Sequence, residues 1–535
     1  MIRNLLTVAF RNISRHKGFS LINIAGLTLG LTACILIGFF VWDEMQFDKF
    51  IPEGNRVFRI YNKYSNNEGT NDLAVSPPAF TTTLQNDFPE VEKTTRVLMQ
   101  APSKKLVEAV KIKLYEENGF YADPTFFDIF PLTFKYAPSG RPLDDPGSIV
   151  ISQEMSERFF GNENPVGKSI TMDKEPLQVK AVFVKNRWFH LQFDYLRPIA
   201  AAGIPADRMN SWGWQQFYSY VKVKDGTNTS FLESKFQKIV QLKSQAFNQD
   251  KNNTNMPFFQ ALNDIHLRSS SFKFDTGERG NILYVNALII IAGFILVIAC
   301  FNFVNLATAK SLQRAKEVGV RKTIGADRSQ LILQFMGESF LLVAISIFIA
   351  IILTLFFLPW LNQFTNKQIP SGLFLNPIVI SLIFILTLLV ATLAGLYPAL
   401  VLSGFKPINV LKSSISQVQS PGKIPWLRNS LVIIQFALSV LLIISAIVVF
   451  KQVDYLHNKD LGFNKEEIMF FPMRGDNMFK NYELFKTELL RAPGISSVSI
   501  GYGFPGDAVA GDEILVPGNG EIKKQSATQL MVDYD

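Results

Sequence analysis

Five long runs of uncharged, mostly apolar residues divide this chain and limit what it can fold into. An apolar helix of about 20 residues crosses the hydrocarbon of a bilayer, because its backbone N–H and C=O groups bond to one another. The runs cover residues 18–42, 280–309, 339–366, 368–405 and 429–450. The sequence therefore predicts an α-helical transmembrane protein with five spans.

The span boundaries follow from the charged and helix-breaking residues beside each run. In the fourth run Pro377 fits the first turn of a helix, because proline lacks only an N–H that would be unpaired there. We expect spans at 18–42, 280–309, 331–360, 377–403 and 429–450. The first run is longer than the apolar part of a cleaved signal peptide, and no small-residue cleavage site follows it, so we expect a permanent anchor.

Lysine and arginine gather in three segments with few or no acids, residues 1–17, 310–330 and 404–428. The net charge of +8 would also fit a nucleic-acid-binding protein. However, cations placed beside apolar runs mark the cytoplasmic side of a membrane protein. We therefore expect these segments and the N-terminus in the cytoplasm, and no nucleic-acid partner. Residues 43–279, the short turn 361–376 and residues 451–535 are then outside.

The segment 43–279 alternates strand and helix patterns and is long enough to form its own core. Short stretches rich in β-branched and aromatic residues predict strands, and apolar residues at helical spacing predict helices. The expected strands are 57–61, 91–99, 148–152, 216–223 and a pair within 169–184, and the expected helices are 78–88, 153–160 and 229–247. This mixture indicates an α+β domain of two lobes.

The segment after the fifth run repeats the start of this pattern. We expect a strand at 467–473, a helix at 481–491 and a strand at 495–501. Repeated halves are common in transporters. The second copy stops at Asp535 without three further spans, so we expect 451–535 to be the start of an incomplete second outer domain in a truncated version of a duplicated protein.

Few residues suggest chemistry. Gly161 to Ser169 resembles a phosphate-binding loop, but five residues separate its glycines where the motif needs four, so we expect a plain turn. The four histidines lack metal-ligand spacing, and His190 is expected to be structural. Cys34 and Cys300 lie inside apolar runs, and Glu338 lies only at the start of one. We therefore expect no catalytic residue, metal or cofactor, although a site assembled from distant residues stays open.

The most distinctive element is the basic segment between the second and third spans. If 311–335 formed one helix, Val320, Ile324, Leu331 and Phe335 would share one side. Glycines there would permit close packing or a bend, and Asp327 suits the N-cap of the third span. The alternative is a solvated basic loop of the kind that membrane topology alone produces.

Several motifs resemble those of the FtsX/MacB family of ABC transporter permeases. The segment Arg314-x-Lys-Glu-Val-Gly-Val-Arg-Lys-x-Ile-Gly-Ala326, followed by Gln334-x-x-x-Glu338-Ser339, is similar to the coupling region of that family. Similar pieces occur before the first span, in the outer segment and in the fourth span: Ala9-Phe-Arg-Asn-Ile-x-Arg-His-Lys, Phe160-Gly-x-Glu-Asn-Pro-Val-Gly-Lys168 and Gly395-Leu-Tyr-Pro398-Ala399.

The resemblance implies a permease that does not hydrolyse ATP, with an outer domain of the MacB periplasmic type, in a bacterial inner membrane. A separate cytoplasmic ATPase would use the ATP and press on the coupling segment, and the outer domain would do the work of export. The implied ATPase-coupling residues are Arg314, Lys316, Glu317, Val318, Gly319, Val320, Arg321, Lys322 and Gly325. A second permease chain, a homodimer or a periplasmic adaptor would complete the assembly, and we expect the chain to be inactive alone.

Relatives of this type export peptides, macrolides or lipoproteins, or activate cell-wall hydrolases. The main alternative is a membrane receptor or scaffold whose outer domain regulates a cell-wall hydrolase or a signalling partner without transport. A membrane enzyme is a third possibility, which would need a catalytic constellation that the sequence does not display.

Overall fold

The computed structural model describes residues 17–66, 69–99, 104–245, 254–403, 424–460, 467–473, 476–502, 511–517, 522–528 and 531–533. It describes the backbone alone for 66, 244–245, 310–317, 402, 424–428, 476–477, 502, 511–515, 517, 522–528 and 531. The predicted lead 1–17 and linker 404–428 lie largely outside these residues. The chain forms two compact units, Met1–Ile447 and Val448–Asp535.

Five helices in the described residues are long and apolar enough to cross a membrane. They are α2 (Lys17–Glu44), α9 (Ile282–Thr323), α10 (Arg328–Thr365), α11 (Pro377–Ser403) and α13 (Ile424–Asn458). Helix α11 begins at Pro377, as the proline predicts. Helix α9 extends well beyond the predicted span 280–309 into the basic segment, whereas α10 extends the predicted span 331–360 by a few residues at each end.

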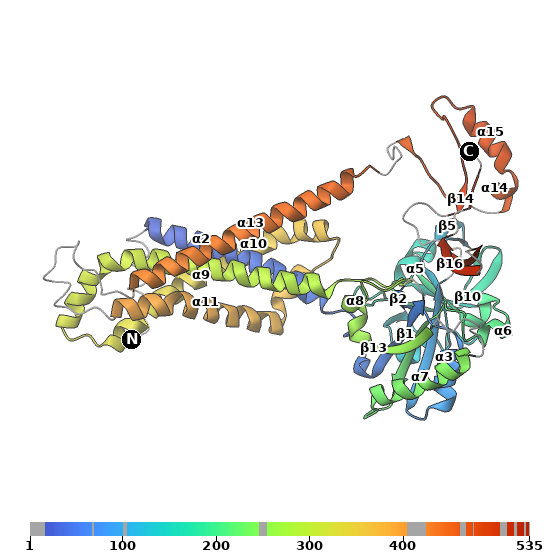
Figure 1. The fold of residues 1–535 in the computed structure, drawn as a ribbon, viewed down its shortest axis with the longest axis horizontal. Helices are drawn as coiled ribbons and strands as arrows, with labels where there is room; N and C mark the ends of the chain where they lie inside the picture. The colour runs from blue at the N-terminus through green and yellow to red at the C-terminus, as the bar shows by residue number, and fades with distance from the viewer. Residues whose placement is uncertain are drawn as a thin grey trace. The chain divides into compact units, whose positions relative to one another are not determined.

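Helices α2, α9, α10 and α11 pack side by side as a bundle (Figure 1). Its core contains Leu31, Phe39, Val343 and Ala394. Small residues allow the backbones to approach closely. A Cβ added at Gly30 would lie 2.8 Å from the Cβ of Ala299, and a Cβ at Gly395 would lie 2.9 Å from the Cβ of Ser339. Close helix contacts therefore link α2 to α9 and α11 to α10.

Residues 43–279, which we name the outer domain after the side of the membrane expected for them, contain one mixed sheet, ordered β13-β1-β12-β3-β6-β11-β8-β10-β9-β4-β5, with β2 beside β1 and β7 beside β10. Most pairs are antiparallel, but β6–β11 and β8–β10 are parallel. The strands are β1 (Val57–Asn66), β2 (Gly69–Leu73), β3 (Val91–Met99), β4 (Lys105–Ala109), β5 (Ile112–Glu116), β6 (Gly119–Ala122), β7 (Phe134–Tyr136), β8 (Ser148–Ser152), β9 (Ser169–Met172), β10 (Glu175–Phe183), β11 (Tyr195–Pro198), β12 (Tyr218–Val223) and β13 (Thr254–Ala261).

Helices pack on this sheet and divide its core into clusters. Helix α7 (Thr229–Gln245) lies against β13, α3 (Ala79–Asp87) against β3 and β12, and α5 (Gln153–Phe160) against β8 and β10 (Figure 1). Phe80 and Phe236 form an edge-to-face pair in the α3–α7 cluster, with ring centroids 5.2 Å apart. Separate clusters lie under α5 and in the middle of the sheet. The α+β prediction is confirmed.

The second unit holds α14 (Asp476–Lys480), α15 (Tyr482–Leu490), β14 (Gly501–Tyr502), β15 (Gly511–Pro517), β16 (Ile522–Thr528) and β17 (Met531–Val532). The helix predicted at 481–491 is present as α15. The strand predicted at 467–473 is wrong, and the strand predicted at 495–501 begins only at Gly501. A strand needs a ladder partner, and β14 pairs with β17 only through Gly501 and Tyr502.

Candidate functional site

The predicted coupling residues lie at the end of α9 and in the turn that follows it. Helix α9 continues without interruption from its apolar part to Thr323, so Arg314, Lys316 and Glu317 are on the same helix as the second span. Their side chains lie outside the described residues. Any movement imposed on this end of α9 therefore reaches the span through a continuous helix backbone.

The helix 311–335 that would place four apolar residues on one side does not form. Helix α9 ends at Thr323 and α10 begins at Arg328. Gly325 has a φ of +101°, which residues with a side chain rarely adopt. The amide of Ala326 donates to the carbonyl of Arg321 at 3.0 Å, and the amide of Gly325 donates to the carbonyl of Lys322 at 3.1 Å. This pair of bonds is the Schellman motif that closes a helix at glycine.

The cations of the turn are fixed to the two neighbouring helices. Arg321 Nη1 donates to Gln334 Oε1 of α10 at 2.7 Å. Lys322 Nζ donates to the carbonyl of Ser403, the last residue of α11, at 2.6 Å. A positive charge at a helix C-terminus is favourable, because the last carbonyls carry partial negative charge. The turn is therefore attached to α9, α10 and α11 at once.

An apolar cluster supports the turn from the side of the bundle. Val318 of α9 packs with Leu331 and Phe335 of α10 and with Ala399 of α11. Val320 and Ile324, which a single helix over 311–335 would have placed on the same side, are instead 46% and 81% exposed. The break at Gly325 changes the direction of the chain and leaves these two residues facing outward. The glycines of the segment and the predicted N-cap at Asp327 were the sequence signals for this division.

Helix α10 begins after Asp327 as predicted, but the capping hydrogen bond expected from this residue does not form. Asp327 is the N-cap residue with extended backbone, and its side chain makes no capping hydrogen bond. Glu338 is buried near the start of the third span, and Gln334 Nε2 lies 3.4 Å from Glu338 Oε1. Together with Arg321, these side chains form a polar row along the first turns of α10.

His190, the histidine with an aromatic setting, is completely buried in the outer domain. Its Nδ1 lies 2.8 Å from Asp48 Oδ1, and its Nε2 lies 2.8 Å from the hydroxyl of Tyr220. Complete burial raises the pKa of Tyr220 well above its usual value, because a phenolate would be desolvated there. The hydroxyl therefore keeps its hydrogen and donates it to the ring. This arrangement suits a structural role, as the sequence predicted.

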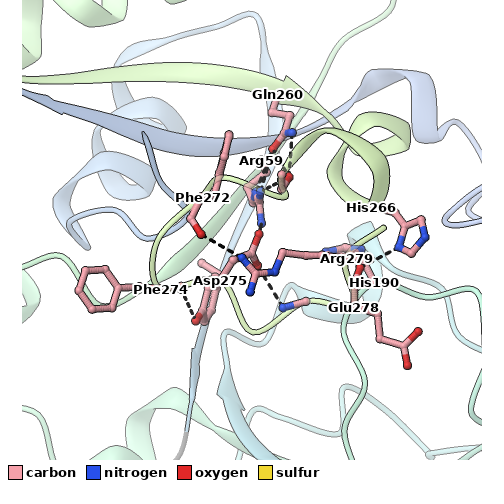
Figure 2. A network of polar contacts seen from close by, with 12 residues as sticks. Arg59, His190, Gln260, His266, Phe272, Phe274, Asp275, Glu278 and Arg279 are labelled. Carbon is pink, nitrogen blue, oxygen red and sulfur yellow. Dashed lines mark hydrogen bonds and ion pairs between the residues drawn. The ribbon is translucent and has the colours of Figure 1, made fainter. Parts of the chain in front are cut away.

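A second polar network next to His190 holds the segment that enters α9 (Figure 2). Arg59 of β1 is buried and forms an ion pair of 2.9 Å with Asp275. Arg59 Nη2 also donates to Gln260 Oε1 and Ser269 Oγ, each at 2.8 Å. A buried charge must be paired to be tolerated, so this network fixes the approach to α9. Sequence reasoning missed these residues.

The turn that resembles a phosphate loop connects α5 to β9, as expected. Gly161 and Gly167 have positive φ values of 62° and 87°, which explains the glycines. Among the described residues there is no group of three His, Cys, Asp or Glu side chains that could hold a metal ion.

Comparison with known proteins matches two families along the chain. The family model for the MacB-like periplasmic core domain matches residues 20–239, and that for the FtsX-like permease C-terminal region matches residues 289–407. The chain is 23% identical over 366 residues to the uncharacterized ABC transporter permease YknZ of Bacillus subtilis (strain 168), an alignment that covers 64% of this chain and 82% of YknZ.

A second relative is the macrolide export ATP-binding/permease protein MacB of Salmonella paratyphi A. It is 20% identical over 397 residues, which are 69% of this chain and 56% of that protein. Among solved structures, the periplasmic region of MacB from Actinobacillus actinomycetemcomitans superposes with a TM-score of 0.29 at 17% identity, over 40% of this chain and 91% of that one. The chain therefore carries a match to the MacB-like periplasmic core domain followed by a match to the FtsX-like permease region, and it is similar to ABC transporter permeases.

Proposed function

We propose that this chain is the permease subunit of an ATP-driven exporter in the bacterial inner membrane. A separate cytoplasmic ABC ATPase docks on the segment 310–330 and changes its shape as it binds and hydrolyses ATP. The spans carry this change to the outer domain, which moves a peptide, an antibiotic or a lipoprotein. Neither ATP nor another cofactor binds to the permease chain itself.

The observation that carries this proposal is the attachment of the turn after α9. Val320 and Ile324 are exposed apolar residues, and exposed apolar residues beside cations suit a protein interface. The neighbouring Arg321 and Lys322 hold the turn to α10 and α11. A partner that pushes on the exposed side therefore moves three span ends together, rather than bending a loose loop.

A pull-down experiment tests this docking surface. The His-tagged permease is co-expressed with the ABC ATPases of the same genome, and the retained ATPase is measured after purification. Ile324→Asp is expected to reduce retention about tenfold or more, because a charge would be desolvated at the centre of the interface. Ile324 is 81% exposed, so the substitution leaves the fold intact.

Val110→Asp is the matched control, because Val110 is 80% exposed in the outer domain. It is expected to retain the ATPase as wild type does. Glu317→Ala tests the same segment at a second position. Equal retention by wild type, Ile324→Asp and Glu317→Ala would count against docking on this segment.

A second candidate function is a scaffold that binds a periplasmic partner without transport. The hairpin β4–β5 favours it, because β5 is the terminal strand of the sheet and Val110, Ile112, Leu114 and Tyr115 of the hairpin are all exposed. Exposed apolar edges often mark binding sites. Substrate export that continues after this hairpin is made polar, but stops with an ATPase that cannot hydrolyse ATP, would reject the scaffold.

A further inference from the structure

The outer-domain end of the spans is joined by buried charges. Glu44, the last residue of α2, receives the Lys367 ammonium on Oε1 at 2.6 Å and faces His266 Nε2 with Oε2 at 3.0 Å. Lys367 lies between α10 and α11, and His266 lies in α8 (Ile265–Arg268) of the outer domain. The side chains of Glu44 and His266 are only 6% and 3% exposed. We call Glu44, Lys367 and His266 the outer joint.

The hydrogen bonds of His266 require one proton more than a neutral imidazole carries. Its Nδ1 lies 2.8 Å from the carbonyl oxygen of Glu278, which can only accept, so Nδ1 carries a hydrogen (Figure 2). Its Nε2 faces a carboxylate oxygen, which also only accepts when ionised. The ammonium of Lys367 on the other oxygen favours the ionised carboxylate. The additional proton therefore belongs on His266.

The other groups around the ring are compatible with an imidazolium. Phe47 stacks on His266 with centroids 3.4 Å apart and planes at 2°, and an aromatic face attracts a cation. The neighbouring Asp43 is already neutralised by Arg187, whose Nη2 lies 2.6 Å from Asp43 Oδ1. A Cβ at Gly280 would lie 2.8 Å from His266 Nε2, so the backbone itself closes the remaining side. The ring has little room to move to other partners.

His190 is the other buried histidine of the outer domain, and its contacts require only a neutral ring. Its Nδ1 donates to Asp48 and its Nε2 accepts from the hydroxyl of Tyr220, so a neutral ring satisfies both contacts. Glu278 connects the two histidines, because its amide donates to the carbonyl of His190 at 3.0 Å while its carbonyl faces His266. The two buried rings therefore differ in the number of protons that their surroundings require.

We propose that His266 is held as an imidazolium and that the outer joint closes only with this proton bound. When the proton leaves, the lone pair of Nε2 faces the Glu44 carboxylate, and the contact between α2 and the outer domain weakens. Glu44 is thus a positioning residue that joins the end of α2, the α10–α11 connection and the outer domain. The role of Glu44 in transmitting movement rests on the proposed function. The protonation of His266 does not depend on that function.

The joint is expected to be more stable at low pH than at high pH. The Nε2–H that bonds the Glu44 carboxylate is present only on the protonated ring, so the stability contributed by this bond is present at low pH and is lost as the pH rises. The measurement therefore spans the usual titration range of free histidine, about pH 6.5. A purely structural role for His266 would give a contribution that does not vary with pH.

The test uses the full-length chain alone, in nanodiscs of phosphatidylethanolamine and phosphatidylglycerol, without an ATPase. Thermal unfolding is followed by tryptophan fluorescence from about pH 5.5 to about pH 8.5, which brackets the titration of histidine. Trp188 reports on the region, because its indole N–H donates to Asp43 at 3.0 Å. Loss of ATPase binding would overturn the proposed function but could not affect this measurement.

Wild type is expected to melt roughly 2–4 °C above His266→Gln at the acidic end, and the difference should approach zero at the basic end. Glu44→Gln should remove the pH dependence while keeping the joint, since a carboxamide N–H can donate to a neutral Nε2 and its oxygen can still accept from Lys367. His457→Gln, which removes a histidine of α13, should follow the wild-type profile.

If the difference in melting temperature between wild type and His266→Gln is the same at every pH, the proposal is overturned. A Glu44→Gln variant that keeps the wild-type slope would also overturn it, and this second result applies even if His266→Gln fails to fold.

Discussion

The two ends of the spans are built in opposite ways. At the turn after α9, hydrogen bonds from Arg321 and Lys322 hold a glycine turn whose apolar residues Val320 and Ile324 are exposed. At the outer joint, Glu44 and His266 are buried and the charges are paired with one another. The first end is suited to receive a partner and the second to hold parts of the same chain together. The difference predicts where substitutions alter binding and where they alter folding.

The largest effect on stability is expected from Glu44→Ala. Removing this carboxylate leaves Lys367 and His266 without their common partner, and breaking a buried ion pair costs about 3–5 kcal/mol. The measurement is thermal unfolding of the chain in nanodiscs. Because Lys367 is 20% exposed, the expected loss of unfolding free energy lies at the lower end of this range, about 3 kcal/mol.

Glu53→Ala is the control for that substitution. Glu53 also pairs with two cations, Arg56 and Lys222, but its side chain is 51% exposed. Water replaces a lost partner there, so little change is expected. If both variants unfold at the same temperature, the burial of the charges in the outer joint does not stabilise the chain as proposed.

A smaller loss is expected from Gly325→Ala at the turn. A side chain at a φ of +101° is strained, and the cost is about 1–2 kcal/mol of unfolding free energy. Gly337→Ala within α10 is the control, because its added Cβ meets no atom within 4 Å and alanine favours a helix. Urea or thermal unfolding of the two variants should give opposite signs. Equal destabilisation by both would contradict the Schellman turn.

The smallest change in stability is expected from Lys322→Met. It removes one charge from the C-terminus of α11, worth about 0.3–1 kcal/mol. Lys243→Met, in the last turn of α7, is the matched control for an exposed cation near a helix end. Lys322→Met is expected to lower ATP-dependent transport far more than stability, because the turn loses the hydrogen bond from Lys322 to the last carbonyl of α11. Transport that falls only in proportion to stability would weaken the coupling role.

Local signals in the sequence predicted local elements well. Helix α5 begins where Ser152 caps it by accepting from the amide of Met155 at 3.1 Å, and α11 begins at Pro377. The strands β3 and β8 have the predicted bounds, because each lies between clear turns and is rich in β-branched residues. The strands β6 and β11 were missed. Each has four residues and pairs in parallel, so neither displays a hairpin or a sustained alternation.

The outer joint could not be predicted from the sequence. Glu44 and His266 are 222 residues apart, and each resembles an ordinary flanking charge when viewed alone. Their meeting depends on the packing of α2, α8 and the α10–α11 connection, which no local pattern encodes. The coupling residues, in contrast, were proposed from a motif and stay a prediction. A single helix over 311–335 would have placed Val320 and Ile324 on one side with Leu331 and Phe335, and the helix break at Gly325 separates these two pairs instead.

The central claim is that movement passes from the turn after α9 to the outer domain across the membrane, and this requires the two regions to lie on opposite faces. Single cysteines at Ile324→Cys and Val110→Cys test it, because the two residues are 81% and 80% exposed. Intact spheroplasts are treated with a membrane-impermeant maleimide, with wild type, whose Cys34 and Cys300 lie in spans, as the background. The account predicts labelling of Val110→Cys in intact spheroplasts and of Ile324→Cys only after permeabilisation. Labelling of both in intact spheroplasts would contradict it.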